Sequence, residues 1–106
     1  MTAAGEPVPI ACSLDAGSVV ERMEEWRAFV ASSVVAMDAD ATSVHLSLDD
    51  SPGALVAAAS LGQREARCCA FFDVAIDLRP DGRSLSLRVP RGAEEALAAF
   101  VAQLTP

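Results

Sequence analysis

The chain has 106 residues and a mass of 11.0 kDa, the size of one domain, so we expect residues 1–106 to form a single domain with a flexible N-terminal arm over residues 1–8. A hydrophobic fraction of 52% excludes an intrinsically disordered chain, and no apolar stretch approaches the roughly 20 residues of a membrane-spanning helix. Eight basic against 15 acidic residues give a net charge of −7, which would repel a phosphate backbone and excludes nucleic acid as a direct partner.

The first residues and the overall residue usage indicate a compartment and a source. Residues 1–7 lack the basic and then apolar regions of an export signal, which predicts a cytoplasmic protein. The chain has no lysine, asparagine or tyrosine and is rich in alanine and arginine, a bias typical of a GC-rich bacterial genome. Three cysteines are an odd number, and in a reducing compartment they favour thiol chemistry or metal ligation over a disulfide framework.

The N-terminal third predicts a short strand and an amphipathic helix. Val8–Cys12 is an apolar run that we interpret as a strand, and Pro9 confines it to a sheet edge or a strand start. Ser18 and Glu21 have the spacing of a capping box, so a helix is expected over residues 18 to about 32. Its apolar residues recur at helical intervals: Val19, Val20, Met23, Trp26, Phe29 and Val30. We expect Trp26 to be a core anchor.

The middle of the chain predicts a half-buried strand followed by a second helix. Residues 43–48 alternate between apolar and polar side chains, which places His45 on the solvent face. Ser51 and Pro52 are a capping residue and a first-turn proline, so a helix is expected to begin there and to run to about Arg67. Its small and apolar residues available for close packing are Leu55, Ala58, Ala59, Gly62 and Ala66.

The C-terminal third predicts a hairpin and a third helix. Residues 72–78 and 85–89 both alternate, and Pro80-Asp81-Gly82 between them supplies turn residues. Residues 94–104 repeat apolar side chains at three- and four-residue intervals. The resulting fold class is α/β, of the α+β two-layer sandwich type. We expect an open mixed sheet of three to four strands with three helices, in the order (β)αβαββα.

The chemistry-bearing residues gather at the end of the second helix. Glu65 lies three and four residues before Cys68 and Cys69, so a continuing helix would bring a carboxylate and two sulfurs to one patch. Thiolates bind zinc and thiophilic ions such as Hg(II) or As(III), and a carboxylate can complete the shell. Adjacent cysteines on a helix point about 100° apart, but a bend at Cys69 would relax this. Arg64 and Arg67 are the nearby cations along the helix.

Cys12 is the third candidate sulfur ligand. If strand 8–12 runs parallel to strand 43–48, Cys12 lies at the opposite end of the sheet from Cys68 and Cys69. The separation would be about 15 Å from the rise per strand residue. A three-sulfur site then requires the N-terminal arm to run differently, or a second subunit to supply Cys12.

One segment carries a family resemblance. Glu65-Ala66-Arg67-Cys68-Cys69-Ala70-Phe71 has the form E-x-x-C-C-x-F, and Cys12-Ser13-Leu14 and Glu25-Trp26-Arg27 extend the match over most of the chain. Together they resemble a small bacterial domain associated with MerR-type heavy-metal-responsive regulators. The resemblance implies a thiophilic metal ion, zinc or a heavy metal, bound by Cys68, Cys69, Cys12 and Glu65. The winged-helix part is absent, which implies a stand-alone sensor or buffer that does not itself read DNA.

Two alternatives of other classes stay open. The element order is similar to that of TusA-type sulfur carriers, in which a cysteine at the entry to the first helix holds a persulfide; Cys12 has that place. However, Ser13 and Asp15 replace both prolines of their Cys-Pro-x-Pro motif. A third hypothesis is a structural interaction module, such as a homodimer, whose cysteines only pack. No phosphate loop, nucleophile elbow or metalloprotease motif is present, which favours a binding protein over an enzyme.

Overall fold

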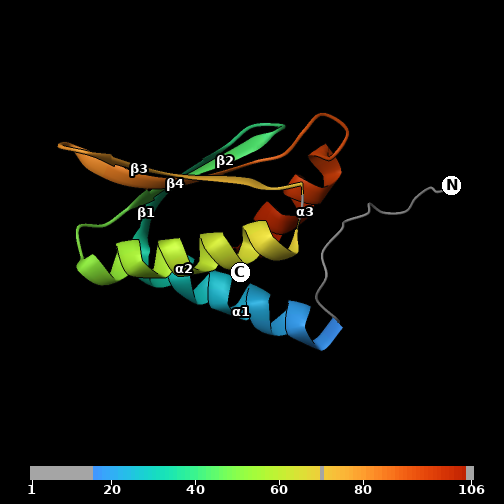
Figure 1. The fold of residues 1–106 in the computed structure, drawn as a ribbon, viewed down its shortest axis with the longest axis horizontal. Coiled ribbons are helices and arrows are strands. Elements are labelled where there is room, and N and C mark those ends of the chain that lie inside the picture. Colours follow the sequence, from blue (N-terminus) through green and yellow to red (C-terminus); the bar gives the residue numbers. More distant parts are fainter. Residues whose placement is uncertain (1–15, 70, 105–106) are drawn as a thin grey trace, which may run out of the picture.

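The computed structural model describes residues 16–69 and 71–104, which form a four-stranded sheet with helices on one side of it (Figure 1). The elements are α1 (Ala16–Ser33), β1 (Val34–Ala39), β2 (Ser43–Leu48), α2 (Pro52–Cys68), β3 (Asp73–Arg79), β4 (Gly82–Arg88) and α3 (Glu94–Leu104). The predicted α+β two-layer class with three helices and an open sheet is confirmed. The expected arm over residues 1–8, the expected strand 8–12 and Cys12 lie outside the described residues.

The strands are ordered β1-β2-β4-β3 across the sheet. Every pairing among the described residues is antiparallel, so the expectation of a mixed sheet was wrong for this part of the chain. Because β2 and β3 both run antiparallel to β4, they are parallel to each other, and α2 makes the connection between them. This connection places the end of α2 just before the start of β3.

β1 is the strand that the sequence interpretation missed. It follows α1 without a break and forms a hairpin with β2, with an irregular register between Val34 and Ala36. Its sequence, VVAMDA, does not alternate, and four of its six residues are exposed, because it is an edge strand that the helices cover only in part. A half-buried strand with a bulge loses the two-residue periodicity by which strands are recognised.

The second helix shows why its sequence forms this local structure. The Ser51 hydroxyl caps the first turn by accepting a hydrogen bond from the Ala54 N–H, and Pro52 follows in the first turn. Gly62 faces the sheet closely, since a Cβ there would lie 2.8 Å from Val74 Cγ1. Ala59 and Ala66, expected to pack, are instead exposed. No helix in residues 16–69 and 71–104 combines the length and apolar character of a membrane span.

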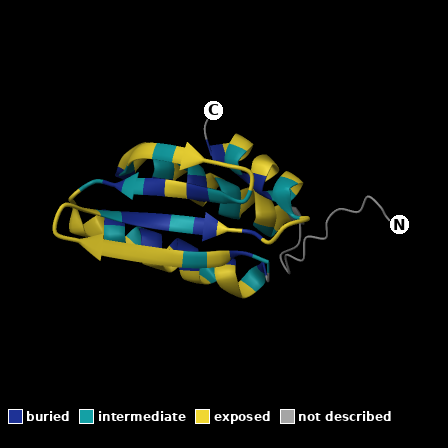
Figure 2. Ribbon diagram, turned by 90° about the horizontal axis from the view of Figure 1, so that it is seen from above, coloured by how far each residue is buried: buried dark blue, intermediate teal, exposed yellow. Residues whose placement is uncertain are grey.

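The core lies between the sheet and the helices. Its largest fully buried side chains are Trp26, Val44, Leu46, Leu85, Leu87, Leu97 and Leu104. The two central strands carry most of the buried sheet residues, whereas the outer strands are largely exposed (Figure 2). Ile76 and Leu78, apolar members of the alternating segment 72–78, are 36% and 64% exposed because they lie on the outer strand β3.

Candidate metal centre

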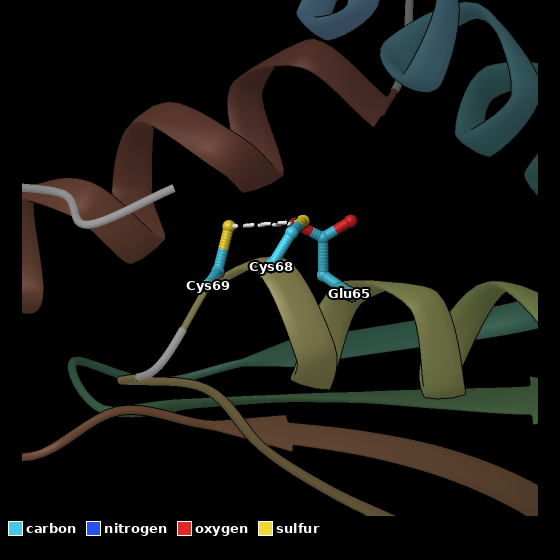
Figure 3. A group of neighbouring side chains, drawn as sticks. All are labelled: Glu65, Cys68 and Cys69. Carbon is cyan, nitrogen blue, oxygen red and sulfur yellow. Dashed lines mark hydrogen bonds between the residues drawn. The ribbon is translucent and has the colours of Figure 1, made fainter. Parts of the chain in front are cut away.

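The last turn of α2 presents a carboxylate and two sulfur atoms together, as predicted. Glu65, Cys68 and Cys69 each offer one ligand atom, and these three atoms lie within 4.8 Å of one another. Their side chains point away from the sheet, on the side where the helices lie (Figure 3). The spacings of three and four residues place them on one face of the helix. They form the one such group of histidine, cysteine and acidic residues in the described ranges.

A bend at Cys69 brings the two sulfurs onto the same side. Cys69 ends the helix with an extended backbone, φ −122° and ψ 94°, while its N–H still donates to the Glu65 carbonyl at 2.9 Å. The two Sγ atoms are consequently 3.7 Å apart. The Cys69 thiol also donates to Glu65 Oε2 at 3.1 Å. The predicted relaxation of the 100° helical divergence is therefore confirmed.

Two side chains of α1 hold the other oxygen of Glu65. Trp26 Nε1 donates to Glu65 Oε1 at 2.9 Å, and Arg22 donates to the same oxygen at 3.2 Å. Arg22 and Trp26 are four residues apart, so they lie on one face of α1. Oε1 is thus held by α1, whereas Oε2 is turned towards the sulfurs. This division of the two oxygens fixes the rotamer of Glu65 and aims one lone-pair region at the cysteines.

The cluster is largely shielded from solvent. Glu65 and Cys69 are 5% and 4% exposed, and Cys68 is half-buried. The Arg22 guanidinium also donates to Cys68 Sγ at 3.5 Å. Burial lowers the pKa of Arg22, but the hydrogen bond to Cys68 and the charge and hydrogen bond of Glu65 together raise it above its ordinary value. Arg22 therefore stays a fixed positive charge beside both acidic groups.

The cation of the site differs from the sequence expectation. Arg64, on α2 itself, pairs with Glu25 of α1 at 2.8 Å on the exposed surface. Arg22, from the other helix, takes the place beside the thiols instead. A contact between neighbouring turns of one helix can be predicted from sequence spacing. Arg22 and Glu65 are 43 positions apart, so their contact cannot be predicted in this way. Only the packing of α1 against α2 reveals this contact.

The remaining predicted residues separate from the cluster. Trp26 is fully buried, with edge-to-face contacts to Phe29 and Phe100 at centroid distances of 5.9 and 5.3 Å, so its role as a core anchor is confirmed. Its hydrogen bond to Glu65 is an additional role that its apolar stripe did not indicate. His45 is exposed on the opposite sheet face, where its Nδ1 lies 3.0 Å from Ser86 Oγ.

Comparison with known proteins assigns no role to these residues. No family model, curated protein or solved structure matches this chain. The resemblance to the MerR-associated domain therefore stays a prediction, as does a sulfur-carrier role for Cys12.

Proposed function

We propose that the protein is a metal-binding domain in which Cys68, Cys69 and Glu65 coordinate a thiophilic divalent ion, zinc fitting best. The observation that supports this most directly is the clustering of two sulfurs and one carboxylate oxygen within 4.8 Å. Two sulfurs each about 2.3 Å from a zinc ion at the tetrahedral angle are about 3.8 Å apart. The Sγ atoms are 3.7 Å apart, so the two sulfurs already have the spacing that zinc requires. The widest separation among the three ligand atoms, up to 4.8 Å, would have to close by about 1 Å.

The same distance discriminates between ions. In a linear two-sulfur complex, bonds as short as those of zinc would already separate the sulfurs by about 4.6 Å. The backbone bend at Cys69 would have to open to allow this. A tetrahedral ion is therefore favoured over a linear Hg(II) complex. Tetrahedral zinc also needs the Cys69 sulfur and a carboxylate oxygen to be about 3.6 Å apart, a modest widening from 3.1 Å.

Charge balance supports the exchange of protons for metal. With neutral thiols, Glu65 and Arg22 form a neutral ion pair. Zinc that displaces both thiol protons adds two positive charges and creates two thiolates, so the buried cluster stays neutral. Because ligands must lose protons, binding should release about two protons per ion and weaken at low pH. Arg22 and Trp26 are the outer-shell groups that keep Glu65 oriented.

Three protein ligands leave one tetrahedral position for water or for Cys12. Structural zinc sites usually have four protein ligands, whereas a site that keeps an open position can bind and exchange a further ligand. This is consistent with a sensor or buffer role. A specific observation also favours the alternative of a structural cluster, since both oxygens of Glu65 already accept hydrogen bonds.

An anaerobic zinc titration by calorimetry separates the two. The reduced, metal-free protein is titrated in two buffers of different ionisation enthalpy, which counts the protons released. We expect one ion per chain for the wild type and loss of binding in the Cys68→Ser/Cys69→Ser variant. His45→Ala is the control, because it removes a potential zinc ligand on the opposite sheet face, away from the cluster. Cys12→Ser tests separately whether Cys12 fills the fourth position. Equal binding by the wild type and the double variant would refute the proposal.

A further inference from the structure

The outer edge of β3 has a regular set of backbone groups to which no strand of the described residues is paired. β3 pairs with β4 on one side, and no strand among the described residues pairs with its other side. The Val89 N–H donates to the Thr42 carbonyl at 2.8 Å. Successive residues of a strand direct their backbone N–H and C=O groups to opposite sides. The odd-numbered residues of β4 therefore form hydrogen bonds with β2, and its even-numbered residues form them with β3. Since Asp73 of β3 is paired with Arg88 of β4, the odd-numbered residues of β3 are the ones whose backbone groups form hydrogen bonds with β4. Val74, Ile76 and Leu78 therefore direct their N–H and C=O groups outward.

The side chains of these three residues form an exposed apolar strip along the same edge. Ile76 and Leu78 are 36% and 64% exposed, and Val74 is half-buried. Beside them, Val74 and Ile76 line a shallow apolar groove together with α2 residues that include Ala59 and Ala66. An open strand edge with an apolar strip is a template for pairing with another strand.

We infer that this edge pairs with the same edge of a second copy of the chain, in an antiparallel register centred on Ile76. That register places Val74 opposite Leu78 of the second copy and Ile76 opposite its own equivalent. It uses all the outward N–H and C=O groups of Val74, Ile76 and Leu78. Pro80, which has no N–H, ends the ladder. The result is a continuous eight-stranded sheet with a two-fold axis at Ile76.

Charge selects this register over its neighbours. When the pairing is centred on Ile76, Asp73 stands directly opposite Arg79 of the second copy, and the two-fold axis makes this ion pair twice. A pairing centred on Ala75 places Asp73 opposite Asp77, and one centred on Asp77 places two copies of Asp77 opposite each other. Like charges directly opposite in a sheet are unfavourable. Within the described part of one chain, Asp77 is the one ion-pair partner of Arg79, at 3.8 Å with both side chains well exposed.

A charge-exchange experiment tests the pairing. The dissociation constant is measured by sedimentation equilibrium on the full-length protein, with a thiol reductant and a chelator present to exclude disulfide-linked and metal-bridged dimers. Asp73→Arg and Arg79→Asp each replace two ion pairs by two repulsive contacts. We expect each single variant to weaken association by about threefold to thirtyfold, and the double variant to restore it to within about twofold of the wild type.

The rescue is specific to an interface between copies. Asp73 and Arg79 are six residues apart on one strand, about 20 Å, so they do not compensate each other within a single chain. Val35→Lys, on the other edge strand, is the matched control and should leave the dissociation constant unchanged. A monomer at every concentration, single variants that associate as the wild type does, a double variant that stays weak, or loss of association in Val35→Lys would each overturn the inference.

Discussion

Replacing Glu65 by alanine should destabilise the metal-free protein strongly, because two buried donors lose their acceptor. Trp26 Nε1 and the Arg22 guanidinium both donate to Glu65 Oε1, and the side chains of Arg22 and Glu65 are only 12% and 6% exposed. Without Glu65, Arg22 keeps only the more distant and half-exposed Glu25, at 3.8 Å, as an acidic partner among the described residues. Removing one partner of a buried ion pair costs about 3–5 kcal/mol. That is a large share of the roughly 5–15 kcal/mol by which native proteins are stable.

Urea unfolding followed by far-ultraviolet circular dichroism measures this effect. A domain of this size has a denaturant slope of about 2 kcal/mol per molar urea, so the unfolding midpoint should fall by about 2 M. Glu25→Ala is the control: Glu25 pairs with Arg64 at 2.8 Å and with Arg22 at 3.8 Å, but its side chain is 48% exposed. An exposed pair of this kind contributes about 0–1 kcal/mol.

The comparison between the two variants decides the result. If Glu65→Ala unfolds within about 0.5 M urea of Glu25→Ala, Glu65 does not hold Arg22 and Trp26 in place. Glu65→Gln should lie between the two, since its amide oxygen still accepts from Trp26 while the ion pair is lost. All measurements need a chelator, because bound metal would add a stabilisation of its own.

Three further predictions concern the scaffold around the site. Gly62→Ala should destabilise the protein by about 1–3 kcal/mol in urea unfolding, because the new Cβ would lie 2.8 Å from Val74 Cγ1. Gly53→Ala is the control: a Cβ there has nothing within 4 Å, so this variant should be neutral or stabilising by up to about 1 kcal/mol. Equal effects of the two variants would contradict the close approach of α2 to β3. Ser51→Ala should cost about 1 kcal/mol through loss of the helix cap, and an unchanged midpoint would show that the cap contributes nothing. Backbone and side-chain hydrogen bonds from Thr42 and Ser43, in the turn after β1, lower the pKa of Asp40. The ionised Asp40 therefore stabilises the folded protein above the unfolded-state pKa of about 3.9. This stabilisation is lost as the pH falls through the lower folded-state pKa. The stability of Asp40→Asn, measured by thermal unfolding from pH 6 to pH 2, should therefore fall less steeply on acidification than that of the wild type, and parallel curves would contradict this.

Local signals in the sequence predicted most of the elements. Ser51 and Pro52 fixed the start of α2, strict alternation gave β2 its bounds, and the turn residues at 80–82 located the β3–β4 hairpin. Each of these signals acts over a few residues, so it can be recognised without knowing what the segment packs against. β1 lacked such a signal because an edge strand with an irregular register keeps no regular alternation.

The candidate site was predictable only in the part that one helix supplies. The spacing of Glu65, Cys68 and Cys69 along α2 sufficed to bring the three together. The orienting contacts from Arg22 and Trp26 come from α1, and they depend on the angle and register at which the two helices pack. Sequence proximity indicated Arg64 and Arg67 as the cations nearest the thiols. Spacing along a single helix does not reveal where an arginine side chain points or which group it pairs with.

The chain has a single tryptophan, and its indole nitrogen is bonded to the carboxylate of the candidate centre. The intrinsic fluorescence of the protein therefore originates from one side chain in direct contact with Glu65. Ligation through the other carboxylate oxygen, or protonation of this carboxylate, changes the charge beside the only indole. If the proposed centre binds metal, the emission spectrum would report its occupancy without a label, in dilute samples and in mixtures whose other components lack tryptophan.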